Sequence, residues 1–190
     1  MTSGSDHSLS SRALLVVAFA IASLTGAFVL DGIDATFGAL LAAVALWVAM
    51  VDLDRFEIPD VANLAILGLG VAWSLQSAGI DREAIAEMVA RSLLAAGLLF
   101  AVREVYRMLR HREGLGLGDV KLAGAGASWL SWSHIILALL VAAVAAIILV
   151  FVRGMLTGER VRAGVAIPFG AFLAPAIWVA WVAQAGGIYP

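Results

Sequence analysis

The sequence predicts an all-α, polytopic membrane protein with about six to seven transmembrane helices. Of its 190 residues, 63% are hydrophobic and only 14% are charged, and the mean hydropathy is +1.00. A soluble domain is about 45–50% apolar, because its surface needs polar groups. In addition, apolar stretches close to the roughly 20 residues that cross hydrocarbon recur along the whole chain. These observations together exclude an ordinary soluble domain.

The apolar stretch 13–30 is the first expected helix. It follows a polar start with a single arginine, and its end offers a poor small-residue cleavage site. A secretory signal would be more basic and would end in a clear site of that kind. We therefore expect residues 1–12 to form a short cytoplasmic segment and residues 13–190 to form one membrane-embedded domain.

Further apolar stretches predict the remaining helices, at 35–51, 61–79, 88–102, 119–131, 134–152 and 165–186. The 119–131 stretch is short, and the serines and tryptophans of "SWLSWSH" (128–134) predict an interfacial turn after it. We expect this helix to begin below the membrane surface, in a cavity rather than in lipid. Six spans with a re-entrant segment are the alternative to seven. Small residues in "GAGAS" (124–128) suit tight helix packing.

Basic residues set the predicted orientation. With seven crossings and a cytoplasmic N-terminus, every lysine and arginine except Arg82 and Arg91 falls on the cytoplasmic side. Asp31 and Asp34 fall in the first external loop. The segment "REVYRMLRHREGLGLGD" carries four arginines, and we expect it to anchor on anionic lipid head groups. Docking of a partner protein is the alternative role for these arginines.

Composition excludes several kinds of chemistry. The chain has no cysteine, so disulfides, thiolate catalysis and cysteine zinc sites are excluded. His7, His111 and His134 lie far apart and lack the helical spacing of a metal site. A net charge of −2 without a basic block gives no sign of nucleic-acid binding. We expect no metal, no cofactor and no nucleic-acid partner.

Two aspartates fall at the predicted cytoplasmic ends of apolar stretches. Asp52 directly follows "ALWVAMV", and Asp119 directly precedes "VKLAGAGA". Ionisable groups at membrane depth persist mainly where they pair or do chemical work. Two carboxyls that share one proton can act as a base towards water and an acid towards a carbonyl, without a metal. The alternative is that both are interfacial helix caps.

The predicted helix ends also suggest how such a pair would hold its proton. Asp119 opens a helix, whose positive end favours the ionised form, and Lys121 lies two residues further on. Asp52 closes a helix, whose negative end favours the protonated form. We therefore expect Asp119 to carry most of the negative charge and Asp52 to hold most of the shared proton.

Three ordered motifs resemble those of bacterial type IV prepilin peptidases. "DLDRFEIPD" (52–60) looks like the first aspartate motif of that family, and "GLGD" (116–119) resembles the GxGD motif of intramembrane aspartic peptidases. "IPFGAFLAPA" (167–176) is similar to the family's Ile-Pro-Phe-Gly segment. The resemblance implies that Asp52 and Asp119 are the catalytic pair, with Asp54 and Asp60 outside the chemistry.

The same resemblance implies the reaction and its location. A membrane-embedded peptidase domain at 13–190 would cut the leader of a type IV prepilin or pseudopilin precursor, after a glycine and before its hydrophobic segment. The site would face the cytoplasm from the bacterial inner membrane. The paired cysteines of the longer members' methyltransferase domain are missing, so we expect the short, peptidase-only form. The partners are then the precursor and membrane lipid, and the oligomeric state stays open.

The motifs contribute supporting residues. Pro59 holds Ile58 extended and marks the turn before the next helix. Gly116 and Gly118 are expected to let the backbone approach the substrate closely, although a merely flexible loop is the alternative. Near them, Lys121 would tune Asp119, bind lipid phosphate or simply extend to the interface.

In the last stretch, Pro168 and Gly170 are expected to loosen a helix that lines the substrate groove, with ordinary kink packing as an equal alternative. A different class of function also fits the two acids, namely a membrane transporter or an assembly scaffold for a pilus or secretion system. A transporter would show broken helices in two matched halves, and the sequence has no such symmetry.

Overall fold

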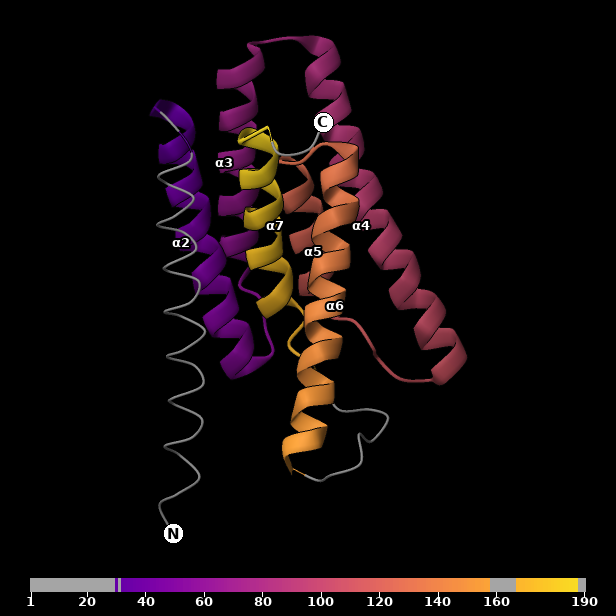
Figure 1. The fold of residues 1–190 in the computed structure, drawn as a ribbon. Coiled ribbons are helices and arrows are strands. Elements are labelled where there is room, and N and C mark those ends of the chain that lie inside the picture. The colour runs from indigo at the N-terminus through magenta and orange to yellow at the C-terminus, as the bar shows by residue number, and fades with distance from the viewer. Residues whose placement is uncertain (1–29, 31, 158–166, 188–190) are drawn as a thin grey trace.

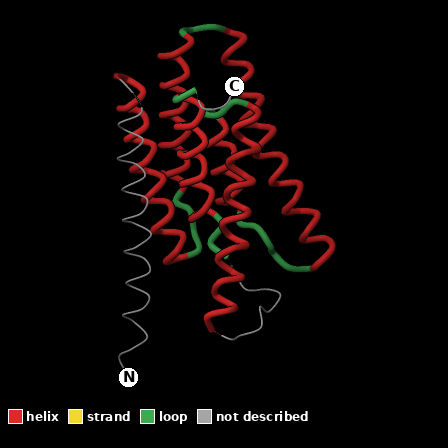
Figure 2. Tube along the Cα trace, viewed as in Figure 1, coloured by secondary structure: helices red, strands yellow, loops and turns green. Residues whose placement is uncertain are grey.

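The helices follow the predicted apolar stretches. The computed structural model describes residue 30 and residues 32–157 and 167–187, and within these ranges the chain forms six helices and no strand (Figures 1 and 2). They are α2 (Gly32–Arg55), α3 (Asp60–Ala78), α4 (Arg82–Arg110), α5 (Leu117–Ala127), α6 (Trp132–Thr157) and α7 (Gly170–Ala185). The expected helix at 13–30 and the expected segment 1–12 lie outside the described residues, apart from position 30.

Three described helices are long and apolar enough to cross a membrane: Gly32–Arg55, Arg82–Arg110, and Trp132–Val152 within α6. The prediction of an all-α, polytopic membrane protein is therefore confirmed, whereas the number of crossings stays a prediction. α5 has only 11 residues. At about 1.5 Å per residue it is about half as long as the hydrocarbon core is thick, so it does not span the membrane.

α5 is enclosed by its neighbours. It contacts α3, α4 and α7, and from Val120 to Ala127 every residue except Lys121 is buried. A Cβ atom at Gly124 would lie 3.0 Å from the Cβ of Ala96 on α4, and one at Gly126 would lie 2.3 Å from the Cδ1 of Ile177 on α7. The expected tight packing of the small residues is confirmed, because only glycine allows such close contact at these positions.

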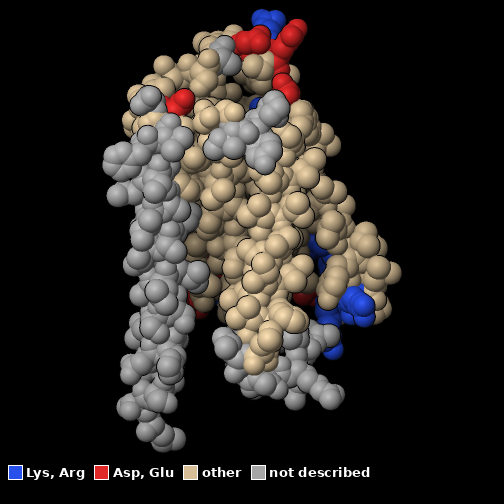
Figure 3. All heavy atoms as spheres, viewed as in Figure 1, with Lys and Arg blue, Asp and Glu red and all other residues tan. Residues whose placement is uncertain are grey.

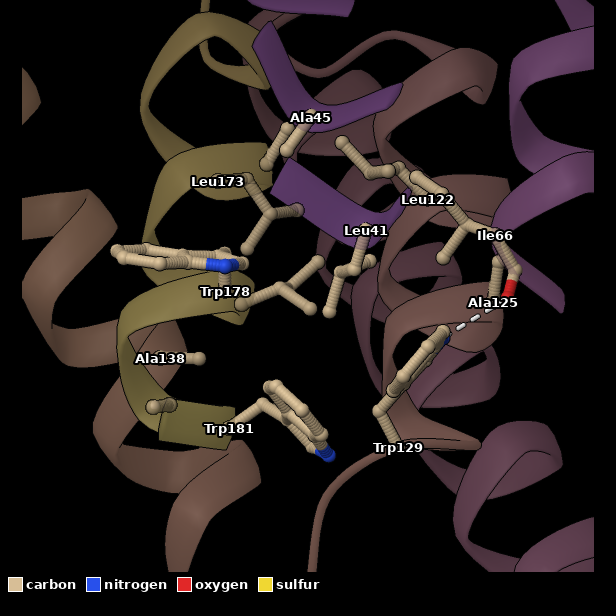
Figure 4. Packing of buried hydrophobic residues seen from close by; sticks show 14 of the residues in the cluster. Leu41, Ala45, Ile66, Leu122, Ala125, Trp129, Ala138, Leu173, Trp178 and Trp181 are labelled. Atoms are coloured by element: carbon tan, nitrogen blue, oxygen red, sulfur yellow. Dashed lines mark hydrogen bonds between the residues drawn. The ribbon is translucent and has the colours of Figure 1, made fainter. Parts of the chain in front are cut away.

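The core is built around aromatic rings at the C-terminal end of α5. Trp129 is 1% exposed, and its indole N–H donates to the carbonyl oxygen of Ile66 at 2.8 Å (Figure 4). Trp73 stacks on it with ring centroids 5.9 Å apart, and Trp181 meets it edge-on at 5.4 Å. The predicted turn after α5 is present, but Trp129 lies in the core rather than at an interface.

The connections alternate between two ends of the bundle. The C-terminal ends of α2, α4 and α6 lie at the same end as the N-terminal ends of α3, α5 and α7 (Figure 1). Blue cationic atoms gather at the lower end of α4 in Figure 3, which is the end of the bundle where α3, α5 and α7 begin. Arg82 begins α4 at the other end of the bundle.

Asp34 lies in the first turn of α2, and its carboxylate accepts a hydrogen bond from the Trp73 indole at 2.8 Å. The expectation that Asp34 lies in a loop is therefore wrong.

Candidate active site

Asp52 lies in the last turn of α2 and is only 4% exposed. The helix continues to Arg55, and Phe56 then adopts a left-handed backbone with a φ of 54°. Pro59, with φ −62° and ψ 132°, is the N-cap of α3. Because proline disfavours a helical backbone in the residue before it, Ile58 stays outside both helices. The predicted turn at Pro59 is confirmed, and it brings Ile58 back towards Asp52.

The N-terminus of α7 closes over Asp52. The backbone N–H of Ala171 donates to Oδ2 of Asp52 at 2.8 Å. A Cβ atom at Gly170 would lie 2.5 Å from Cδ1 of Ile58 and 3.1 Å from that same Oδ2. Position 170 therefore requires glycine for the helix end to reach the carboxyl. The expectation that Pro168 and Gly170 loosen a helix is wrong, because α7 begins at Gly170 and Pro168 precedes it.

Asp119 is the third residue of α5 and is 8% exposed. Its Oδ2 atom accepts from the backbone N–H of Gly116 at 3.2 Å, which caps the start of the helix. Its Oδ1 atom is buried and has no hydrogen-bond partner among the described residues. The Oδ2 oxygen of Asp119 is thus held by the backbone of Gly116.

Gly116 and Gly118 pack against the chain itself. A Cβ atom at Gly116 would lie 3.2 Å from Oδ2 of Asp119, and one at Gly118 would lie 3.0 Å from the Cβ of Ile58. The absence of side chains lets the Asp119 carboxyl and the Ile58 segment come close together. Both glycines also line the cavity described next, so the expected approach of substrate to their backbone stays a prediction.

A cavity of about 400 Å³ joins the two acids. Its wall is formed by Asp52, Phe56, Glu57, Ile58, Asp60, Gly116, Leu117, Gly118, Asp119 and Lys121. Of these, Phe56, Glu57, Ile58 and Leu117 were not predicted from the sequence as residues of the site. Three of them belong to the segment between Asp52 and Pro59, so the spacing of that motif was the signal that could have found them. Asp54 is exposed and does not line the cavity.

The two carboxyls influence each other electrostatically. Burial raises the pKa of Asp119 to about 6, and the charge of Asp52 adds to this rise, while backbone N–H groups of Gly116 and Gly170 oppose it. The Gly170 N–H also acts on Asp52. A carboxyl with such a pKa retains its proton in mildly acidic conditions.

The structure adds donors that the predicted helix ends did not include, and the assignment of the shared proton stays a prediction. Asp52 does close α2, but the N–H groups at the start of α7 converge on its carboxyl, and donors of this kind stabilise a carboxylate. Asp119 feels the charge of Asp52 and holds its proton more tightly. Asp52 therefore has backbone donors from α7 that stabilise its charged form, and Asp119 has the charge of Asp52 beside it. The prediction from the helix ends considered each acid only within its own helix, without the donors from α7.

Lys121 forms an ion pair at the mouth of the cavity. Its Nζ atom lies 2.6 Å from Oδ1 of Asp60, and the two side chains are 52% and 69% exposed. Asp60 is therefore part of the cavity wall, although the resemblance implied no chemical role for it. Whether Lys121 also contacts lipid stays a prediction. Within the described ranges, no group of three or more histidine, aspartate or glutamate side chains is arranged to hold a metal ion.

Comparison with known proteins adds independent information. Residues 39–151 match the type IV leader peptidase family. The chain is 32% identical over 170 residues to a prepilin leader peptidase/N-methyltransferase of Burkholderia pseudomallei (strain K96243), covering 87% of this chain and 50% of that protein. A protein of the same description from Aeromonas salmonicida is 28% identical over 148 residues, covering 76% of this chain and 49% of that protein.

The protein of that description from Escherichia coli (strain K12) is 30% identical over 161 residues, covering 85% of this chain and 68% of that protein. This chain spans about half the length of the Burkholderia and Aeromonas relatives that it matches. No solved structure matches it.

Proposed function

The chain belongs to the type IV leader peptidase family, and from this premise we propose that it is an intramembrane aspartic endopeptidase with Asp52 and Asp119 as its catalytic pair. Its substrate would be a type IV prepilin or pseudopilin precursor. The cut would fall after a glycine and before the hydrophobic segment, which would release a short leader.

One observation carries the proposal. Asp52 and Asp119, from two helices far apart in the sequence, are both nearly buried, line the same cavity and interact electrostatically. Buried carboxyls that face each other without a cation between them are costly. A pair of this kind that shares one proton has both an acid and a base available for hydrolysis of a peptide bond.

In the first step, a water molecule between the carboxyls attacks the carbonyl carbon of the scissile peptide. The Asp52 carboxylate, held by the Ala171 N–H, takes a proton from this water. The Asp119 proton passes to the carbonyl oxygen at the same time. A tetrahedral diol forms, and the pair has exchanged states, so that Asp52 is protonated and Asp119 is ionised.

In the second step, the diol collapses. Asp52 donates its proton to the leaving nitrogen as the C–N bond breaks. One diol hydroxyl returns a proton to Asp119 as the new carbonyl forms. The products are a free carboxyl on the leader and a free amine on the mature chain, and the pair regains its starting protonation. The unpartnered Oδ1 of Asp119 is the oxygen available for these transfers.

The charge distribution supports a cytoplasmic site in the inner membrane. The cavity lies at the end of the bundle that also holds Arg103, Arg107, Arg110 and Arg112 of the α4 extension and its loop. Lysine and arginine favour the cytoplasmic side of membrane proteins. A precursor whose hydrophobic segment lies in the membrane could then present its preceding glycine at the level of the two aspartates.

The test is cleavage of a synthetic precursor with a leader, a glycine and a hydrophobic segment by the purified protein in detergent micelles. Asp52→Asn and Asp119→Asn should each lose nearly all turnover, by about three orders of magnitude or more, and the double variant should lose little beyond that. Asn keeps the size of the side chain while removing its proton.

Asp34→Asn is the matched control, because Asp34 lies at the opposite end of α2 and its Trp73 bond survives with an amide oxygen. Asp54→Asn should also remain active. Near wild-type cleavage by either Asp52→Asn or Asp119→Asn would overturn the two-aspartate mechanism. A dead Asp54→Asn variant would instead mean that the first motif is misassigned by two residues.

A further inference from the structure

Arg103 is a buried arginine whose contacts lie within the protein. It is 8% exposed, in the last two turns of α4. Its Nη1 atom lies 2.9 Å from Oε1 of Glu104, and its Nη2 atom lies 3.2 Å from Oε1 of Glu113. The expectation that this arginine anchors on lipid head groups is wrong for Arg103. By contrast, Arg107 is 53% exposed and pairs with Glu104.

The remaining donor of Arg103 reaches the loop that precedes Asp119. Its Nε–H donates to the carbonyl oxygen of Leu115 at 3.0 Å. The next atom along the chain is the nitrogen of Gly116, whose N–H donates to Oδ2 of Asp119 at 3.2 Å. The two hydrogen bonds therefore lie on opposite sides of one peptide unit, which is rigid and planar.

We propose that Arg103 is a positioning residue that holds the Asp119 carboxyl through the Leu115–Gly116 peptide unit. The loop from His111 to Gly116 has no regular structure of its own, so it depends on contacts with α4 for its place. One contact is the bond from Arg103 to Leu115. A second is the ion pair of Glu113 with Nη2 of Arg103, and a third is the packing of Gly114 on the Tyr106 ring, where a Cβ atom would lie 2.5 Å from Cδ1. This inference rests on the proposed function, because it assigns a role in that reaction.

The link has an electronic consequence as well as a mechanical one. A donor on the carbonyl oxygen of a peptide polarises it and makes its N–H a better donor on the other side. A better donor to Oδ2 stabilises the ionised form of Asp119 and so lowers the pKa of that carboxyl. Removing Arg103 should therefore raise the pKa of Asp119, and the proton should be retained to higher pH.

Other groups near Asp119 set the background for this effect. Asp52 faces it from α2, and the Gly170 N–H at the start of α7 opposes the influence of that charge. Lys121 on α5 is paired with Asp60 on α3. Glu104 and Glu113 accompany Arg103 on the α4 side. None of these groups touches the Leu115–Gly116 peptide as Arg103 does among the described contacts.

The experiment compares Arg103→Met with Arg107→Met, a matched change one turn further along α4. For precursor cleavage, the alkaline limb of the pH profile of kcat/KM should move to higher pH by about 0.5 to 1 unit in Arg103→Met. Its kcat should fall about tenfold, because the acid is less well placed. Arg107→Met should keep the wild-type limb. A uniform loss of rate with an unmoved limb would mean a merely structural role and would overturn the proposal.

A second readout needs no cleavage. The infrared band of the protonated Asp119 carboxyl, identified by its loss in Asp119→Asn, should titrate at higher pH in Arg103→Met than in the wild type. An unchanged midpoint would overturn the link even if the enzyme is active. Failure of the wild type to cleave would reject the proposed function and leave this readout intact. If Arg103→Met does not accumulate, Arg103→Lys is measured in its place. Lysine keeps the charge without the planar donor, so the midpoint of the Asp119 titration should shift in the same direction.

Discussion

Replacing Asp119 by asparagine should make the protein more stable at neutral pH and leave its stability nearly unchanged in acid. The folded protein raises the pKa of this carboxyl from 3.8 to about 6, through burial and the charge of Asp52. Because the pKa is raised on folding, the ionised carboxyl opposes folding. The opposition is absent below about pH 4, grows between pH 4 and 6, and is complete above about pH 6. A rise of this size corresponds to about 3 kcal/mol.

The measurement is the apparent Tm of the wild type and Asp119→Asn in the same detergent, from pH 4.5 to 8. About 3 kcal/mol corresponds to roughly 6–10 °C in a protein of this length, so the variant should unfold that much higher at pH 8. Asp34→Asn, at the other end of α2, should show no such pH-dependent gain. A gain in Tm of equal size at every pH, or no gain at pH 8, would refute the reasoning that the ionised Asp119 carboxyl destabilises the folded protein.

Three further results are expected. The kcat/KM of precursor cleavage should fall as the pH rises through about 6, because Asp119 then loses the proton that it donates; a rate that keeps rising to pH 8 would contradict this. Gly170→Ala should lose most activity, since the new Cβ would meet Ile58 at 2.5 Å, and Ile58→Val, which removes the contacting Cδ1, should restore part of it in the double variant. In this cysteine-free chain, Ser133→Cys should react with an impermeant thiol reagent only from outside and Arg112→Cys only from the cytoplasm; the opposite pattern would invert the orientation.

The meeting of the two acids could be predicted because the spans alternate in direction. Asp52 ends one apolar stretch and Asp119 begins another, and counting crossings puts both at one end of the bundle, where the structure has them (Figure 1). The turn at Pro59 was equally accessible, since it depends only on local backbone sterics. Features that depend on alternation and on one residue's neighbours along the chain can thus be predicted from the amino-acid sequence alone.

The place of a side chain that depends on a partner from another helix or loop could not be predicted in this way. Counting basic residues cannot distinguish a lipid-facing arginine from Arg103, which is buried and bonded to Leu115. The aromatic character of "SWLSWSH" suggested an interface, but the carbonyl of Ile66 on α3 supplies a buried partner for the Trp129 indole. Each of these side chains carries a polar group, and its place depends on whether another helix offers that group a partner.

The start of α7 shows why the third motif belongs with the two acids. A glycine in the middle of a helix mainly weakens it, but Gly170 stands at the first position of α7, where its missing side chain lets the N–H groups reach Asp52. Of these N–H groups, only that of Gly170 is also found to act on Asp119. The two carboxyls therefore experience unequal stabilisation although both are buried. In the proposed mechanism, this inequality makes one carboxyl the base and the other the acid, and the difference comes from a segment more than a hundred residues away from Asp52 along the chain.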